Sequence, residues 1–243
     1  MADFYKDNFD SDIMHRNVFK LYLKGDSGGE KKIASLLKRH SVDSVFCFSD
    51  FLAKNIFALE NLKFNFLSIR NTYKLAGSGY TARSTQKLDD RFKVLQYSKD
   101  KPKISKPDIL RFARIIGATS RYFHDSAIPK IYAERLYVRW IENSLKGYAD
   151  ECFMVMRGGR LAGLITLKIK EAAGYIDLIG VGENYQGIGL GGVLASRSIE
   201  YFKSKNIKNI FVVTEGENLQ ANIFYQKNGF ITQNVELVYH KHF

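Results

Sequence analysis

Hydrophobic and polar residues follow two different periods in the first third of the chain. Short, mostly apolar runs that suit β-strands occupy residues 19–23, 45–48 and 63–73. Between these runs, apolar residues recur every three or four positions over 30–40 and again after Ser49, a residue type that caps helices. The order strand, helix, strand, helix, strand predicts a small α/β unit of about 75 residues.

The rest of the chain predicts a second unit with a different order. A strand at 92–97 leads to a helix whose start is marked by Ser105 as N-cap and Pro107 in the first turn. A second helix is predicted at 130–146, where Gly147 ends it. Three strands, a helix, a strand, a helix and a final strand follow, at 152–156, 161–169, 175–181, 190–203, 210–214, 218–228 and 230–239.

A polar, glycine-containing stretch at residues 74–90, KLAGSGYTARSTQKLDD, separates the two units and is the best candidate linker. We therefore predict a small α/β N-terminal domain over 1–80, a linker with the first strand of the next domain over 81–105, and a larger domain over 106–243. A long surface loop within a single domain is the alternative.

Composition indicates a folded protein that does not enter a membrane. No window has the roughly 18 consecutive apolar residues that span a bilayer, and the first residues, MADFYKDNFDSD, are acidic, unlike a signal peptide. We therefore expect a cytoplasmic protein. Cys47 and Cys152 lie in strand-like apolar runs, which predicts buried free thiols. His240 and His242 are expected in a solvated C-terminal tail, so no metal is predicted.

The net charge of +12 favours an anionic partner. Basic residues are spread over 31–32, 38–39, 99–106 and 203–208, as is typical of solvated helix ends and loops. Because no basic helix and no aromatic-interleaved RNA motif accompanies the charge, we expect no nucleic-acid partner. A phosphorylated small molecule would use the same positive field.

The most informative stretch is IDLIGVGENYQGIGLGGVL, residues 176–194, in which an apolar strand runs through a glycine turn into a helix-compatible segment. Glycines let the backbone close on a ligand, and free N–H groups and the helix dipole attract negative charge, so the geometry suits a diphosphate. A P-loop is disfavoured because no Lys follows the glycines, and we disfavour a dinucleotide loop as well. A glycine turn without a ligand is the alternative.

Two motifs in this region resemble the GNAT family of N-acetyltransferases. Gln186, Gly189 and Gly191 match the coenzyme A loop Q/R-x-x-G-x-G/A. The segment ENLQANIFYQKNGF resembles the family's N-x-x-A-x-x-x-Y-x-x-x-G-F helix, and the element order of the second unit is the GNAT order. The resemblance implies an α/β (α+β) protein with the GNAT fold, a mixed, mostly antiparallel sheet flanked by helices, preceded by the smaller α/β domain.

The resemblance also assigns roles to residues. Acetyl-CoA would be the co-substrate, with Val181 pairing with its pantetheine arm and Asn218 touching that arm. The backbone N–H of Ile179 would face the acetyl oxygen as a one-donor oxyanion site. Tyr225 would donate a proton to the departing thiolate, with a role as a core aromatic as the alternative. The pyrophosphate would be held by backbone N–H groups of Gln186, Gly187, Ile188, Gly189, Leu190 and Gly191.

The acceptor is indicated by Ser120-Arg121-Tyr122 and the segment YVRWIENSLKG, which resemble the dTDP-fucosamine acetyltransferases that act on dTDP-4-amino-4,6-dideoxy sugars. This resemblance implies a nucleotide-sugar small molecule as partner. Arg121 would reach its diphosphate, Tyr137 and Trp140 would stack on a sugar or base unless they are core residues, and Asn143 would bind hydroxyl groups. The alternatives are a protein N-terminus or lysine as acceptor, and a domain that binds acetyl-CoA without catalysis.

No general base stands out in the sequence. Glu134, Glu142 and Asp177 are carboxylates near the predicted cleft, but surface pairing is the expected role of each. A water chain to solvent would serve a weakly basic sugar amine. The sequence leaves open whether the N-terminal domain contacts substrate or forms a homodimer interface.

Overall fold

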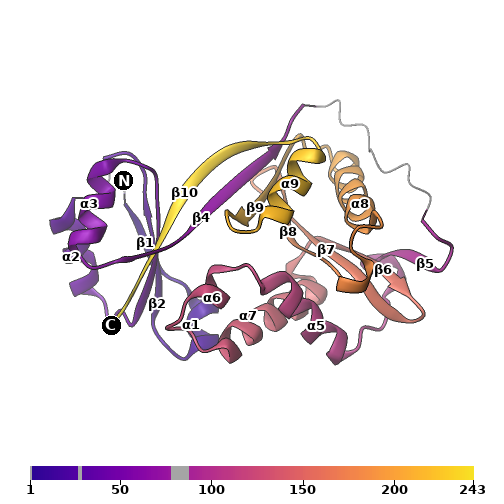
Figure 1. Cartoon of the computed structure of the whole chain (residues 1–243), viewed down its shortest axis with the longest axis horizontal. Helices are drawn as coiled ribbons and strands as arrows, with labels where there is room; N and C mark the ends of the chain where they lie inside the picture. The colour runs from indigo at the N-terminus through magenta and orange to yellow at the C-terminus, as the bar shows by residue number, and fades with distance from the viewer. Residues whose placement is uncertain (1, 27–28, 78–87) are drawn as a thin grey trace.

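The computed structural model describes residues 2–26, 29–77 and 88–243 (Figure 1). Within them, the strands form one ten-stranded sheet in the order β1-β2-β3-β10-β4-β9-β8-β7-β6-β5. The strands are β1 Asp3–Lys6, β2 Val18–Leu23, β3 Ser44–Ser49, β4 Asn65–Leu75, β5 Phe92–Gln96, β6 Glu151–Arg157, β7 Arg160–Lys170, β8 Ala173–Val181, β9 Asn209–Glu215 and β10 Phe230–His242. The α-helices are α1 Asn8–Met14, α2 Glu30–Arg39, α3 Ala53–Asn61, α4 Tyr97–Asp100, α5 Lys106–Gly117, α6 Arg121–His124, α7 Lys130–Asn143, α8 Leu190–Ser204 and α9 Leu219–Lys227.

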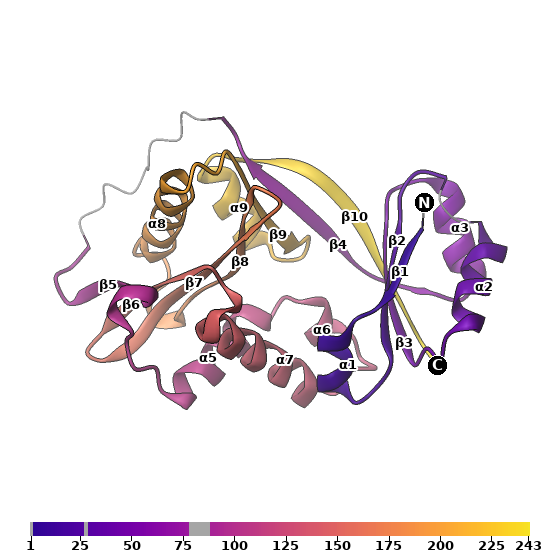
Figure 2. The ribbon, with the colours of Figure 1, turned by 180° about the vertical axis from the view of Figure 1, so that it is seen from behind.

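Two long strands, β4 and β10, join the N-terminal part of the sheet to the rest. Figures 1 and 2 show them side by side, running from the part with α2 and α3 toward α9. β4 pairs with β10 on one edge and with β9 on the other, from Arg70↔Glu215 to Lys74↔Phe211. A strand of the first 80 residues therefore belongs to the same sheet as the second unit. The domain boundaries stay a prediction, and residues 78–87 of the predicted linker lie outside the described residues.

Helices cover both faces of the second part of the sheet. Phe112 of α5 and Leu136 of α7 share one hydrophobic core with Met154 of β6. Phe202 of α8 shares another core with Val155, the next residue along β6. Neighbouring residues of a strand point to opposite faces, so one strand serves both cores. This part of the sheet therefore lies between two layers of helices.

Of two helix N-caps predicted from the sequence, one is confirmed and the other is wrong. The Ser105 hydroxyl oxygen accepts a hydrogen bond from the Asp108 backbone N–H at 3.2 Å and begins α5, as predicted. The expected cap at Ser49 is wrong, because Ser49 lies in β3 and its hydroxyl donates to the Asp50 carbonyl oxygen. The helix α3 begins at Ala53 without a side-chain cap.

The helix predicted over 130–146 divides into two segments. The α-helix α7 ends at Asn143, and a π-helical turn, Ser144–Tyr148, follows it. Gly147 in that turn has a φ of 108°, which a side-chain-bearing residue rarely adopts. The short elements β1, α1 and α6 have no counterpart among the predicted elements, because four to seven residues are too few to show a period.

The C-terminal residues do not form the expected solvated tail. His240 and His242 lie on β10, where β3 pairs with them, and their side chains are 11% and 17% exposed. Cys47 and Cys152 are buried free thiols, as predicted. Among the described residues, we find no helix with the length and apolar character needed to cross a membrane.

Candidate active site

The parallel strands β8 and β9 separate toward their C-terminal ends. They pair only from Ala173 to Ile176, opposite residues 209–212, although both strands continue. The divergence begins after the pair Ile176↔Val212. A cleft of about 1250 Å³ opens beside this gap. Small-molecule sites commonly measure about 300–1,000 Å³, so this cleft has room for an extended ligand.

The cleft brings most of the predicted cofactor-binding residues together. One wall consists of the end of β8, the glycine loop and α9, and α5 and the start of α7 contribute the other. The predicted residues that line it are Ile179, Val181, Gln186, Gly187, Gly189, Leu190, Gly191, Asn218 and Tyr225. Ile188 is outside the lining and 44% exposed.

The free edge of β8 presents two backbone N–H groups to the gap. The Gly182 N–H donates to the Ala162 carbonyl oxygen of β7 at 2.9 Å. N–H groups alternate between the two edges of a strand, so those of Ile179 and Val181 point away from β7, toward the side that β9 has left. An oxyanion donor and a partner strand for a ligand both need this orientation.

The glycine loop leaves a row of backbone donors without partners. Gly187 and Gly189 have φ values of 78° and 89°, in the left-handed region that costs other residues about 1–2 kcal/mol. Gly189 is the N-cap of α8. The N–H groups of residues 187–192 have no backbone acceptor in the described structure. Together with the helix dipole, they form a cradle suited to an anion.

Two polar side chains fix the edges of this cradle. The Gln186 amide nitrogen Nε2 donates to the Val181 carbonyl oxygen at 3.2 Å. Asn218 Oδ1 accepts from the Ala221 N–H at 3.0 Å and is the N-cap of α9. This cap fixes the orientation of the Asn218 side chain, and its amide nitrogen can donate to a ligand.

Tyr225 lies on α9 at the cleft and is 2% exposed. Its ring packs against those of Tyr73, Phe224 and Phe230. Burial raises the pKa of Tyr225, so the phenol is protonated at neutral pH. The described residues give its hydroxyl no hydrogen-bond partner. A protonated, uncommitted hydroxyl at the cleft is what transfer of a proton to a thiolate requires.

Arg121 does not reach the cleft. Its Nη1 pairs with Glu215 Oε1 at 3.1 Å, and its Nη2 donates to the Tyr122 hydroxyl at 2.9 Å. The guanidinium also lies over the rings of Phe46 and Phe48. Arg121 therefore neutralises a buried carboxylate between β9 and the N-terminal strands.

The other predicted acceptor residues also lie outside the cleft lining. Tyr137 is 7% exposed and its ring stacks on that of Trp140, with centroids 5.8 Å apart. Trp140 Nε1 donates to Asp177 Oδ2 at 2.8 Å. Asn143 is the last residue of α7. The structure does not bring these side chains to the predicted cofactor-binding residues.

The three carboxylates near the predicted cleft have different surroundings. Glu134 lines the cleft and pairs with Arg114, with Oε1 2.9 Å from Nε. Asp177 lies outside the lining, where burial raises its pKa despite the hydrogen bond from Trp140. Glu142 is outside the lining as well. No general base emerges from this set.

The sequence analysis did not predict three basic side chains that line the cleft, namely Arg111, Arg114 and Lys130. Arg111 pairs with Asp108 at 3.0 Å, whereas Lys130 is exposed and has no ion pair within the described structure. The sequence holds a signal for the two arginines, because Ile109, Phe112, Ala113 and Ile116 recur at helical spacing and leave Arg111 and Arg114 on the opposite face. The sequence does not show that this face lines a cleft, because the cleft forms only where α5 packs against β8.

Comparison with known proteins connects this geometry to one family. Residues 117–230 match the model described as the acetyltransferase (GNAT) family. The spore coat polysaccharide biosynthesis protein SpsD of Bacillus subtilis is 24% identical over 132 residues, 54% of this chain and 46% of that protein. The mycothiol acetyltransferase of Beutenbergia cavernae is 33% identical over 82 residues, 33% of this chain and 28% of that protein. The matches thus span less than half of either relative.

Solved structures share the fold along nearly the whole chain. A GCN5-related N-acetyltransferase from Sphaerobacter thermophilus has a TM-score of 0.63 at 9% identity and covers 99% of this chain and 76% of its own. A functionally unknown conserved protein from Staphylococcus epidermidis has a TM-score of 0.65 at 14% identity, covering 96% and 88%. The protein has the GNAT fold, and the family match supports an acetyl-CoA-dependent acyltransferase.

Glycine spacing by itself does not separate this loop from a dinucleotide loop. Gly187, Gly189 and Gly192 satisfy G-x-G-x-x-G, so the motif alone is no ground for disfavouring that class. The GNAT family match and the divergence of β8 from β9 provide the distinction.

Proposed function

We propose that the protein transfers an acetyl group from acetyl-CoA to the amino group of a nucleotide-linked amino-deoxy sugar, of the dTDP-4-amino-4,6-dideoxyhexose type, for surface polysaccharide synthesis. The observation that carries the transferase activity is that one cleft is lined both by Tyr225 and by the glycine loop, whose N–H groups have no backbone acceptor in the described structure. An anion cradle and a protonated hydroxyl lie in the same cavity, which suits a thioester that carries a diphosphate.

The reaction we propose is direct attack without a covalent enzyme intermediate. The amine nitrogen forms a bond to the acetyl carbon, and the carbon–sulfur bond breaks. The Ile179 N–H donates to the carbonyl oxygen while negative charge develops there. Tyr225 gives its proton to the leaving sulfur and regains one from solvent, and the proton lost by the amine passes to water.

Two observations support a phosphorylated acceptor. Arg111, Arg114 and Lys130 give the wall formed by α5 and α7 a positive charge, which attracts a diphosphate. The relative SpsD carries a name that refers to spore coat polysaccharide biosynthesis. Arg114 and Lys130 replace Arg121 as the proposed diphosphate-binding cations, because both line the cleft, whereas Arg121 lies outside it in a buried pair with Glu215.

A thiol-release assay with acetyl-CoA tests the proposal. The acceptors compared are dTDP- and UDP-linked amino sugars, peptides with a free N-terminus or a lysine, and mycothiol-related amines, included because a relative is named for mycothiol. We expect the highest kcat/KM with a dTDP-linked 4-amino sugar. Turnover confined to peptides or mycothiol-related amines would exclude the sugar acceptor and keep the transferase. Binding of acetyl-CoA without turnover on any acceptor would favour a non-catalytic module.

A further inference from the structure

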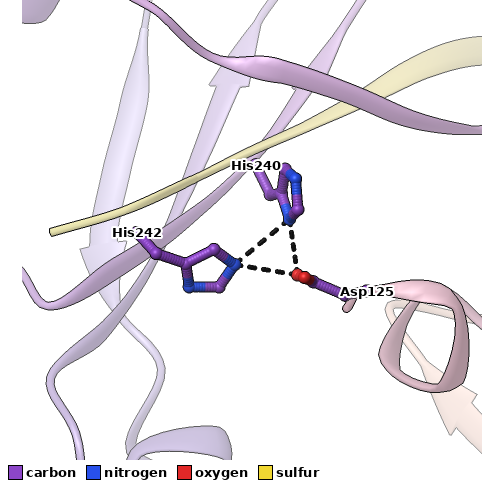
Figure 3. Close-up of side chains that lie close together, drawn as sticks. All are labelled: Asp125, His240 and His242. Carbon is purple, nitrogen blue, oxygen red and sulfur yellow. Dashed lines mark hydrogen bonds and ion pairs between the residues drawn. The ribbon is translucent and has the colours of Figure 1, made fainter. Parts of the chain in front are cut away.

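Two histidines and an aspartate, residue types that can bind a metal ion, come from distant parts of the chain and meet at the end of β10 (Figure 3). His240 Nδ1 lies 2.5 Å from Asp125 Oδ2, and His242 Nε2 lies 2.9 Å from the same oxygen. The two imidazole nitrogens are 3.1 Å apart. Asp125 follows α6 along the chain, whereas both histidines lie on one strand.

The backbone explains why the three side chains converge. His240 and His242 are two residues apart on β10, so their side chains project from the same face of the sheet. Asp125 is the C-cap residue of α6, and its N–H donates to the Arg121 carbonyl oxygen at 2.9 Å. The cluster therefore spans the seam between the end of β10 and the α6–α7 connection.

Outer hydrogen bonds orient two of the three groups. The His242 Nδ1 atom is 2.8 Å from the Ser44 hydroxyl, which leaves Nε2 facing the cluster. Asp125 Oδ1 accepts from the Ala127 N–H at 2.9 Å, which leaves Oδ2 facing the two imidazoles. Metal-binding histidines and carboxylates typically have such outer partners, which fix the ring tautomer and orientation.

We propose that Asp125, His240 and His242 bind a divalent transition metal, with Zn²⁺ as the expected ion. Two imidazole nitrogens and one carboxylate oxygen are ligands that zinc takes readily, with bonds of about 2.0–2.2 Å. Ligands of a tetrahedral site at that distance are about 3.3 Å apart. The separations of 2.5, 2.9 and 3.1 Å would need to widen by only a few tenths of an ångström to about 0.8 Å.

The surroundings indicate a structural rather than a catalytic ion. The Asp125 side chain is fully buried, and the histidines are 11% and 17% exposed. None of the three lines the cleft of the proposed acetyl transfer. An ion here would join β10 to the α6–α7 connection, which follows the cleft-lining residue Phe123. Water would complete the coordination.

Zinc titration of the chelator-stripped full-length protein tests the site, with a competing chromophoric chelator to report affinity. We expect one tightly bound Zn²⁺, and Asp125→Asn should weaken its binding by at least about 100-fold, because the charged carboxylate ligand is lost. Ser44→Ala should weaken it by about 10- to 100-fold through the orientation of His242 alone. His15→Asn is the matched control, because His15 is exposed and its φ of 53° is one that asparagine tolerates.

Circular dichroism of each variant confirms that it is folded before titration. Substitution by Co²⁺ gives a second readout, since tetrahedral nitrogen and oxygen ligation produces a visible absorption band that Ser44→Ala should diminish. Equal zinc affinity in the wild type, Asp125→Asn and His15→Asn would overturn the proposal. The cluster would then be a metal-free hydrogen-bond network in which both imidazoles donate to Asp125.

Discussion

The ring of Tyr73, on β4, packs against the ring of Tyr225, on α9, with centroids 6.0 Å apart and planes inclined by 41°. The Tyr73 hydroxyl donates to Asn222 Oδ1 at 2.8 Å and accepts from Gln226 Nε2 at 3.4 Å. A strand from the N-terminal part thus holds the helix that carries the proposed proton donor. The two hydroxyls differ in one respect, since that of Tyr73 is used in the structure and that of Tyr225 is not.

Replacing Tyr225 by Phe should slow acetyl transfer and leave acetyl-CoA binding intact. We expect turnover to fall by about 10- to 10⁴-fold, because the leaving thiolate loses its proton donor. Acetyl-CoA affinity, measured by calorimetry, should stay close to that of the wild type. An unchanged turnover number would rule out the proton-donor role.

Replacing Tyr73 by Phe should have the opposite profile. The ring contact with Tyr225 is kept, but the hydrogen bond to Asn222 is lost, so the free energy of unfolding should fall by about 0.5–1.5 kcal/mol. Asn222 Oδ1 keeps a second donor, Asn71 Nδ2 at 2.9 Å, which limits the loss. Chemical denaturation measures the change. A large drop in turnover in a variant of near-normal stability would instead give the Tyr73 hydroxyl a part in the chemistry.

Adding a methyl group at Gly189 should weaken acetyl-CoA binding. The φ of 89° strains an alanine by about 1–2 kcal/mol, and any relief moves the donors of the anion cradle, so the KM for acetyl-CoA should rise by about 5- to 30-fold. Gly158→Ala is the matched control, with a φ of 54° in the turn between β6 and β7. It should lower stability comparably and leave KM unchanged. Equal KM changes in both variants would indicate a global effect.

Asp108 should make the protein sensitive to acid. Burial alone would raise the pKa of Asp108, but hydrogen bonds from Arg160, Arg111 and Ser105 outweigh it and lower that pKa to about 2. The unfolded value is about 3.9, so the stabilisation is present above that pH and is lost as pH falls toward 2. Asp108→Asn should flatten the dependence of unfolding free energy on pH over this window. The exposed Asp12→Asn should not, and an identical slope in both variants would contradict the assignment.

Lys130 should contribute to acceptor affinity. Lys130→Met removes an exposed cleft cation, and we expect the KM for a dTDP-linked amino sugar to rise by about tenfold, with kcat nearly unchanged. Steady-state kinetics at two ionic strengths measures the effect, which salt should reduce. Lys146→Met, an exposed lysine outside the cleft, is the control. A KM change of the same size in Lys146→Met would show that the effect comes from net charge and not from the position of Lys130.

Local sequence pattern was sufficient to predict much of the fold and the glycine-loop residues that line the cleft. The period of apolar residues and the Ser105 cap predicted α5, and the glycines marked the loop before α8, because these signals lie within a few residues of each other. The ion pair of Arg121 could not be predicted, because it depends on a residue far away in the sequence. Its partner, Glu215, is 94 residues away, and no periodicity relates the two. The same holds for Asp125 and His240, which are 115 residues apart.

The position of β10 between β3 and β4 has a consequence for synthesis of the chain. Both neighbours leave the ribosome long before β10 does, so each carries an unpaired edge in the growing polypeptide. Such edges pair readily with other chains, and strand pairing over long sequence separations is slow. We therefore expect the nascent protein to need protection by chaperones until β10 is made. A message truncated before that strand would yield an aggregating product rather than a smaller enzyme.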